Sequence, residues 1–394
     1  MIPGRDLATD LAELGDVIAE LRDCIGARVA APEPPDWCAR RGWDGWLLAL
    51  DPARLERAEA RGLAALELAD APESLQALVA RVEALTALPE PEVEAAPLRR
   101  ASARKARQVA ALVELARTLG PCARVVDVGA GRGHLTRELA RGLGVPALGV
   151  ERNPERVAAA SALDRGEGAA FEVRELGSEL AFEAGDLAVG LHACGALGDR
   201  LVAAAARDRA PVLLVNCCLQ HVGDAGRAPL SAQGRGLGLH LGRRVLGLTN
   251  LVAGRRLVAG EAAQVTRERE ARYGLRLFLA GRGLTLPPGA EMQGLNRRHA
   301  RRGLEALAQR ACARRELAPP TPAELADVAP RAAREFGAIR RLSLPRALLG
   351  RALELAVVLD RARCLEEAGH RVRVQAVFAR DDSPRNLGIL ASLA

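Results

Sequence analysis

The spacing of apolar residues changes once along the chain. Up to residue 88 apolar positions recur every three or four residues, which predicts amphipathic helices over residues 6–30 and 51–88. From residue 98 onward, short apolar runs typical of buried strands alternate with helical stretches. The predicted strands cover residues 123–128, 147–151, 169–174, 187–191, 211–215, 372–378 and 387–390, and the predicted helices cover residues 102–119 and 134–143 and a segment that begins at Pro154.

This alternation predicts an α/β fold in which a doubly wound, mostly parallel sheet carries helices on both faces. The last two predicted strands form a C-terminal antiparallel hairpin, and a mostly helical, arginine-rich insert occupies about residues 226–368. A proline-rich stretch that ends at Pro97 marks the predicted boundary between an acidic helical N-terminal domain, residues 1–97, and a second domain, residues 98–394.

The formal charge divides at the same boundary. The whole chain carries +7, but residues 1–97 hold 19 acidic and 9 basic residues, a net charge of −10, so residues 98–394 carry +17. This division suits a polyanionic partner that contacts only the basic part, although a solvated arginine surface gives the same pattern. Lys105 is the single lysine, and six arginines without an acidic residue lie between Asp224 and Glu261, namely Arg227, Arg235, Arg243, Arg244, Arg255 and Arg256.

Composition narrows the class of protein. With 49% hydrophobic and 27% charged residues, the chain has the composition of a globular protein. It has no apolar run long enough to span a membrane, and its first residues lack the segments of a secretory signal. Eight cysteines, of which Cys217 and Cys218 are adjacent, do not form the pattern of a disulfide framework. We therefore expect a cytoplasmic protein without a membrane partner.

A glycine loop between a predicted strand and a predicted helix is the first motif with chemical content. The loop follows Asp127 with the pattern G-x-G-x-G, and the dinucleotide fingerprint fails because its third glycine would be His134. A second acid, Glu151, ends the next strand, which completes a pattern typical of S-adenosylmethionine sites. Glycines admit the methionine and ribose portion, Asp127 organises the loop and the cofactor's ammonium group, and Glu151 accepts the ribose hydroxyls. The predicted cofactor-binding residues are Asp127, Gly129, Gly131, Gly133 and Glu151.

Four reactive side chains, His192, Cys194, Cys217 and Cys218, follow the fourth and fifth predicted strands. Consecutive strands are usually neighbours, and ligands bind at the carboxyl ends of such sheets, so these side chains should converge beside the cofactor. Three interpretations compete: buried pocket walls, a thiolate that adds to C6 of a pyrimidine while a second thiol assists release, and metal ligands. Adjacent cysteines at a strand end do not easily point at one ion and C-x-x-C spacing is absent, so we predict no metal. We treat the four residues as candidate catalytic residues.

Six motifs resemble, in order, those of one family. They read VVDVGAGRGHL at 125–135, GLHACG at 190–195, Cys-Cys at 217–218, PLS at 229–231, LDR at 359–361 and SPRN at 383–386. From about Trp37 to the C-terminus the chain resembles the methyltransferase-like proteins named for a ribosomal RNA adenine dimethylase domain. The resemblance implies a Rossmann-like class I S-adenosylmethionine-dependent methyltransferase fold with a helical N-terminal layer. In this fold the penultimate strand runs parallel to the others, so residues 381–386 should face the cofactor's edge of the sheet.

The chain departs from this family at two places. Leu219 stands where the family has a tyrosine after the two cysteines, so a stacking or hydroxyl role is lost there. Ahead of the first strand the family has Lys-Lys-x-His-Glu, whereas this chain has Gln108 in place of the carboxylate. Lys105 lies in the same element, and we predict that it binds substrate. Arg385 is the second predicted substrate-binding residue, through a phosphate or carboxylate, unless it caps carbonyls of a structural turn.

Together these features predict an S-adenosylmethionine-dependent methyltransferase that acts on RNA. Transfer is direct displacement at the sulfonium carbon, which depends on positioning more than on acid or base groups. Methylation of adenine amino groups usually relies on an Asn/Asp-Pro-Pro-aromatic loop after the fourth strand, and residues 192–195 read His-Ala-Cys-Gly instead. The alternatives are methylation of a protein side chain and a non-catalytic module that binds RNA or the ribosome and retains the cofactor pocket.

Overall fold

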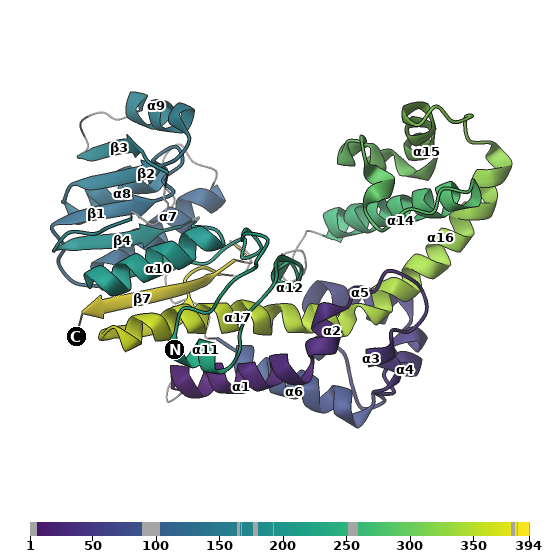
Figure 1. Ribbon diagram of the computed structural model, residues 1–394, viewed down its shortest axis with the longest axis horizontal. Coiled ribbons are helices and arrows are strands. Elements are labelled where there is room, and N and C mark those ends of the chain that lie inside the picture. The colour runs from purple at the N-terminus through teal and green to yellow at the C-terminus, as the bar shows by residue number, and fades with distance from the viewer. Residues whose placement is uncertain are drawn as a thin grey trace. The chain divides into compact units, whose positions relative to one another are not determined.

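Contacts between residues divide the chain into two compact units (Figure 1). The computed structural model describes the chain outside residues 1–5, 89–102, 164–165, 167, 176–179, 192, 251–258, 380–382, 384 and 394, and describes only the backbone at 103–105, 259–262 and 297. The first unit contains Met1–Arg22, Val82–Ala253 and Leu349–Ala394, and the second contains Asp23–Arg81 and Gly254–Leu348. The predicted domain boundary at Pro97 lies outside the described residues, and residues before it contribute to both units.

The first unit is built on a seven-stranded sheet with the order β3-β2-β1-β4-β5-β7-β6. The first five of these strands in the order are parallel, β7 is antiparallel to β5, and β6 is antiparallel to β7. β6 therefore points in the same direction as β1 to β5, which confirms the predicted Rossmann-like sheet with its C-terminal antiparallel strand. The strands are β1 (Arg124–Val128), β2 (Ala147–Glu151), β3 (Ala169–Val173), β4 (Asp186–Gly190), β5 (Val212–Val215), β6 (His370–Ala376) and β7 (Leu387–Leu393).

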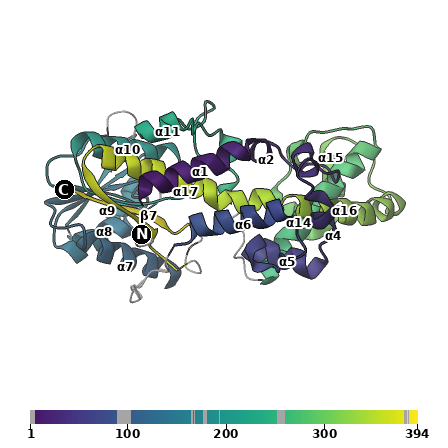
Figure 2. The ribbon, with the colours of Figure 1, turned by 90° about the horizontal axis from the view of Figure 1, so that it is seen from below.

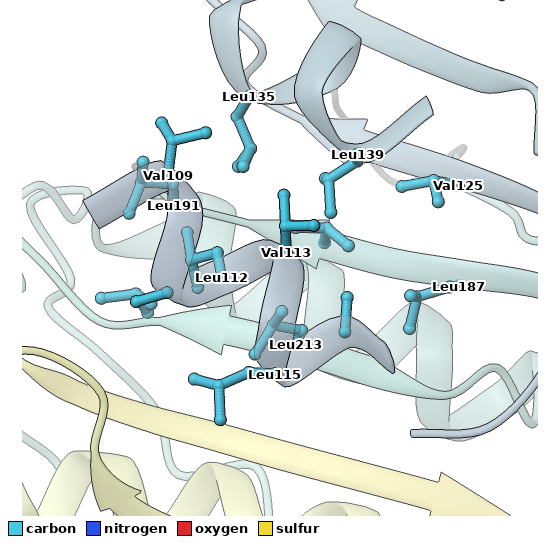
Figure 3. Close-up of a cluster of buried hydrophobic side chains, with 14 of the residues drawn as sticks. Val109, Leu112, Val113, Leu115, Val125, Leu135, Leu139, Leu187, Leu191 and Leu213 are labelled. Atoms are coloured by element: carbon cyan, nitrogen blue, oxygen red, sulfur yellow. The ribbon is translucent and has the colours of Figure 1, made fainter. Parts of the chain in front are cut away.

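Helices cover both faces of the sheet. On one face α7 (Ala103–Arg117) and α8 (His134–Leu143) enclose an apolar core, where Leu112 and Val113 of α7 lie over Leu187 of β4 and Leu213 of β5 (Figure 3). On the other face α10 (Ala196–Asp208) contacts β4 and β5. α9 (Pro154–Ala162) contacts β2 and β3 on the same face as α8, and the Arg137 side chain of α8 donates to the Ala160 carbonyl of α9 at 3.1 Å. The residues of β1, β2, β4 and β5 are nearly all buried on both faces, so these strands read as continuous apolar runs in the sequence. β6 lies at the edge of the sheet and alternates buried and exposed residues.

Four further described helices have most or all of their residues in the first unit: α1 (Leu7–Glu20), α11 (Ala232–Gly236), α12 (Arg243–Leu246) and α17 (Leu344–Glu367). Asp6 caps α1 by accepting a hydrogen bond from the Thr9 amide at 3.1 Å. α1 lies beside α11, where the Gln233 side chain donates to the Ala8 carbonyl at 2.6 Å (Figure 2). As predicted, the described part of residues 226–368 is mostly helical.

The second unit is helical in its described part. The helices with most or all of their residues in this unit are α2 (Arg22–Gly26), α3 (Asp36–Ala39), α4 (Asp44–Ala49), α5 (Pro52–Arg61), η1 (Leu63–Ala65), α6 (Glu73–Thr86), α14 (Ala259–Gly281), η2 (Ala290–Met292), η3 (Arg297–Arg302), α15 (Gly303–Arg314) and α16 (Pro322–Leu342). The helical stretch predicted over residues 51–88 is divided into α5, η1 and α6, because Gly62 adopts a φ of +96° and ends α5. None of the helices that the structure describes is both long and apolar enough to cross a membrane.

Candidate active site

The glycine loop joins β1 to α8 at the carboxyl edge of the sheet. Gly129, Gly131 and Gly133 have φ angles of +83°, +60° and +69°, a left-handed conformation that other residues rarely adopt. The amide of Gly129 donates to the Val150 carbonyl at 2.8 Å, which fastens the loop to β2. A Cβ atom added to Gly131 would have only the Gly129 carbonyl oxygen within reach, at 4.0 Å. The backbone at Gly131 therefore borders open space, as close approach of a ligand requires.

Glu151 lies at the end of β2 with its carboxylate held beside this loop. Its side chain is buried, with 6% of the residue exposed. Oε2 accepts a hydrogen bond from the Gly131 amide at 3.1 Å, and Oε1 accepts one from the Asn153 amide at 3.1 Å. A carboxylate oxygen accepts two hydrogen bonds, so each oxygen retains capacity for a ligand donor such as a hydroxyl.

Asp127 at the end of β1 is buried and bonded to the following helix. Its carboxylate accepts a hydrogen bond from the Thr136 hydroxyl of α8 at 2.7 Å. Burial raises the pKa of Asp127 to about 6, the Thr136 hydrogen bond opposes this rise, and the charge of Glu151 adds to it. Sequence reasoning did not identify Thr136, although its position in the first turn of the helix after the loop is the signal that identifies it.

We expect Asp127→Asn to change the pH dependence of stability in the cofactor-free protein. Between pH 3.8 and about 6 the folded state holds a proton on Asp127 that the unfolded state has lost, so wild-type stability falls as pH rises through this window. The free energy of unfolding of the wild type falls by about 3 kcal/mol over the whole window, whereas that of Asp127→Asn does not change for this reason. Urea unfolding at about pH 4 and about pH 7 measures the difference, with the variant the more stable protein at the higher pH.

Asp208→Asn is the control for this prediction. An ion pair with Arg207 lowers the pKa of Asp208, so its stabilising contribution is present at neutral pH and disappears on acidification. The control variant should therefore be less stable than the wild type at neutral pH and equal to it in acid. A constant difference between Asp127→Asn and the wild type across the pH range would contradict the buried, protonated carboxyl.

Three thiols come together where β4 and β5 end. β4 and β5 are neighbours, as expected, and the sulfurs of Cys194, Cys217 and Cys218 all lie within 4.8 Å of one another. The Cys194 and Cys217 sulfurs are 2.6 Å apart. The expectation that adjacent cysteines diverge is wrong, because β5 ends at Val215 and the alternation of side chains ends with it. His192, the fourth candidate catalytic residue, lies outside the described residues.

The three thiols differ in acidity. The pKa of Cys194 is lowered to about 6, mainly because of its hydrogen bond with Cys217, and burial opposes this change. The same hydrogen bond and burial raise the pKa of Cys217. Burial also raises the pKa of Cys218, against the charge of Arg385. Cys194 is therefore the most acidic thiol of the cluster.

A buried arginine of α17 joins the two loops that carry the thiols. Arg361 is 0% exposed. Its Nη2 donates to the carbonyl of Gly195 at 2.8 Å, next to Cys194 in the sequence, and its Nη1 donates to the Asn216 side chain, next to Cys217. The resemblance had singled out Arg361 without giving it a role, and here it positions both loops.

Arg361 belongs to a buried network of ion pairs. Its Nε donates to Asp199 at 2.9 Å, and Arg227 donates to Asp199 at 3.0 Å and to Asp360 at 2.6 Å. Burial opposes ionisation of Asp199, but the charges of both arginines hold its pKa below the usual value. Arg227 is only 4% exposed, so it does not belong to the exposed basic surface that the arginine run predicts. The network instead fixes α10, α17 and the segment before α11.

The two predicted substrate-binding residues are described to different extents. Arg385 follows β6 at the expected edge, where its Nη2 donates to the Asn250 side chain. This contact goes to a side-chain amide, so in the described residues the guanidinium makes no carbonyl cap, and its Nη1 is buried without a hydrogen-bond partner there. Lys105 lies in α7, but its side chain and residues 380–382 lie outside the described part of the chain.

The family match with known proteins lies in the part of the chain that contains β1 to β5 and the loops between them. Residues 103–224 match a family model described as a methyltransferase domain. A TehB-like SAM-dependent methyltransferase from Corynebacterium glutamicum matches at 19% identity over 26% of this chain and 60% of its own, with a TM-score of 0.22. The magnesium protoporphyrin IX methyltransferase from Synechocystis, solved with bound SAH, matches at 22% identity over 27% of this chain and 52% of its own, with a TM-score of 0.23. This chain thus covers less than two thirds of either structure. The family match and the strand order confirm the predicted class I methyltransferase domain and its cofactor, S-adenosylmethionine.

Proposed function

We propose that this chain, in which residues 103–224 form an S-adenosylmethionine-dependent methyltransferase domain, transfers a methyl group to RNA. The observation that carries the proposal is the placement of guanidinium groups at the carboxyl edge of the sheet. Arg243 donates to the Val222 carbonyl at 2.7 Å, in the loop that follows the thiols, and Arg244 beside it is exposed. Arg385 adds a third guanidinium at the same edge. Phosphate groups of RNA are the natural ligands for such side chains.

The residues around the glycine loop fit the cofactor. Open space beside Gly131 and the fixed carboxylate of Glu151 suit a ribose and an amino acid portion better than a phosphate, which a carboxylate repels. When bound, the cofactor supplies a methyl group on a sulfonium, which a nucleophilic atom of the acceptor displaces. Glu151 accepts hydroxyl donors with its remaining lone pairs, and Asp127 holds the loop against α8 through Thr136. The chain's contribution is chiefly to bind and orient the two reactants.

RNA is favoured over a protein acceptor by charge. Residues 98–394 carry +17, and because residues 103–224 hold 15 basic and 15 acidic residues, this charge lies in the segments that flank the methyltransferase domain. Residues 192–195 do not match the loop with which methyltransferases that act on the adenine amino group hold the base. The proposal therefore names RNA as the acceptor and leaves the methylated atom to be mapped by experiment.

Labelled cofactor incubated with separate RNA and protein fractions tests this function. We expect label in RNA that ribonuclease releases, and Glu151→Gln should lower incorporation by about 10- to 100-fold, because hydrogen bonds to a charged group contribute about 1.5–3 kcal/mol. Glu155→Gln, which removes an exposed carboxylate from α9, is the matched control and should keep the wild-type rate. Label in the protein fraction would point to protein methylation. Cofactor binding without transfer to either fraction would point to a non-catalytic module.

Binding of structured RNA should weaken steeply as salt increases, because each contacted phosphate releases a counterion. Arg244→Gln should lower the slope of log K against log salt by about 1. Arg141→Gln, which removes an exposed guanidinium near the far end of α8, should leave the slope unchanged. Fluorescence anisotropy over a salt series measures both values. Equal affinity at low and high salt would exclude this mode of binding.

A further inference from the structure

The thiol cluster has the geometry of a ligand set rather than of a pocket wall. Three sulfurs from two loops, those of Cys194, Cys217 and Cys218, lie within 4.8 Å of one another. Three sulfur ligands at about 2.3 Å from one zinc ion in a tetrahedral arrangement lie about 3.8 Å apart. Small rotations of the side chains therefore take the three sulfurs from their positions to those of a metal site.

The two loops are held in this arrangement before any ion binds. Gly195 follows Cys194 with a φ of +52°, and a Cβ atom there would lie 2.1 Å from the His221 carbonyl oxygen. Only glycine allows this approach, which brings the first thiol loop against the second. The Ala196 amide donates to the same carbonyl at 3.0 Å. Arg361 donates hydrogen bonds to both loops. The loops are therefore already ordered, and binding of an ion loses little further conformational entropy.

We propose that Cys194, Cys217 and Cys218 bind a thiophilic divalent cation, with Zn²⁺ as its probe. Each thiol that coordinates the ion releases a proton, so three thiolates and Zn²⁺ leave one net negative charge, which Arg385 beside Cys218 offsets. Three protein ligands leave one tetrahedral position for water or a further side chain. His221 is the nearest candidate in sequence, three residues after Cys218 and hydrogen-bonded through its amide to the Cys218 carbonyl at 3.2 Å.

This site does not take part in methyl transfer, and it makes the three thiols metal ligands instead of nucleophiles. A nucleophilic cysteine needs a sulfur that faces its substrate, whereas the Cys194 sulfur faces Cys217 at 2.6 Å and shares its surroundings with Cys218. The same short distance makes a Cys194–Cys217 disulfide the competing outcome. Metal binding and disulfide formation are distinguished by mass, by metal content and by the need for a reductant.

Metal content of the full-length protein, purified in reductant without chelator, tests the proposal. We expect close to one zinc per chain, and Co²⁺ exchanged into the site should give the near-ultraviolet absorption of thiolate-to-cobalt charge transfer. Cys194→Ser, Cys217→Ser and Cys218→Ser should each lower zinc affinity by at least about tenfold, and His221→Gln should lower it less. Cys122→Ser is the matched control, because Cys122 is also half-buried but precedes β1 at the opposite edge of the sheet.

A second measurement covers the case in which a serine variant does not fold. Alkylation of the folded wild-type protein, located by mass spectrometry, should modify the three cluster cysteines only after zinc is removed, whereas modification of Cys122 should not depend on zinc. Protein that takes up neither Zn²⁺ nor Co²⁺ would overturn the proposal. So would a Cys194–Cys217 disulfide that persists in reductant, or alkylation of the cluster that zinc does not slow.

Discussion

Gly131→Ala will weaken binding of S-adenosylmethionine by about 100-fold, equivalent to about 2.7 kcal/mol. Two effects add. The φ of +60° at Gly131 disfavours any residue with a Cβ atom by about 1–2 kcal/mol, and this cost distorts the loop. The new methyl group also points into space in which the protein has only the Gly129 carbonyl oxygen, at 4.0 Å, and which the ligand needs. Isothermal titration calorimetry with the cofactor or its demethylated product measures the loss.

The chain offers a matched control at the other end of the same helix. Gly144 caps α8 with a φ of +70°, and a Cβ atom there meets no other atom within 4 Å. Gly144→Ala therefore carries the same backbone strain without a change at the cofactor loop. It should lower the melting temperature as Gly131→Ala does, while cofactor affinity stays at the wild-type value. Equal affinities for the two variants would show that the cofactor does not approach Gly131.

Arg361→Met will lower the free energy of unfolding by about 3–5 kcal/mol, because it leaves buried acceptors without their partner. The lost contacts are those to Asp199, to the Asn216 side chain and to the Gly195 carbonyl. Methionine fills a similar volume, so the effect reports the polar contacts more than a cavity. Urea denaturation followed by circular dichroism measures the change. The thiol loops should also separate, and alkylation of Cys217 should become faster.

Arg363→Met is the control on the same helix. Arg363 is partly exposed and pairs with Glu366 at 2.6 Å, and a pair of this kind contributes at most about 1 kcal/mol. Asp199→Asn combined with Arg361→Met completes a double-mutant cycle. The free energy of unfolding should fall less in the double variant than the sum of the decreases in the two single variants, because the double variant removes both members of one buried pair. Additive losses would mean that the two residues act separately.

The elements of the sheet could be predicted because their signals are local. The helix at 134–143 and the strand at 147–151 match the structure at both ends, since left-handed glycines flank the helix and a short apolar run forms the strand. The break after Arg61 was missed, because apolar spacing continues past Gly62 and only its φ of +96° ends the helix. A glycine within a periodic stretch does not by itself reveal its conformation.

In the candidate site, too, contacts between residues close in sequence could be predicted, and contacts between distant residues could not. The glycine loop and Glu151 lie within one strand-loop-helix-strand segment, so their spacing already predicts their proximity. The bond from Arg361 to Asp199 joins residues 162 positions apart, and no periodicity relates them. Arg227 was misassigned for the same reason: its charge is visible in the sequence, but its burial against Asp199 and Asp360 is a property of the tertiary structure.

The position of β7 between β5 and β6 affects how the protein is made. During synthesis, the edge of β5 opposite β4 has no strand partner until Leu387–Leu393 has left the ribosome, long after Val215. The growing chain therefore exposes an apolar sheet edge while the intervening helices are translated, and such edges pair readily with other chains. Final closure depends on pairing between distant parts of the sequence, which is slow. Conditions that delay translation of this last strand should increase aggregation of the nascent chain more than they impair the finished protein.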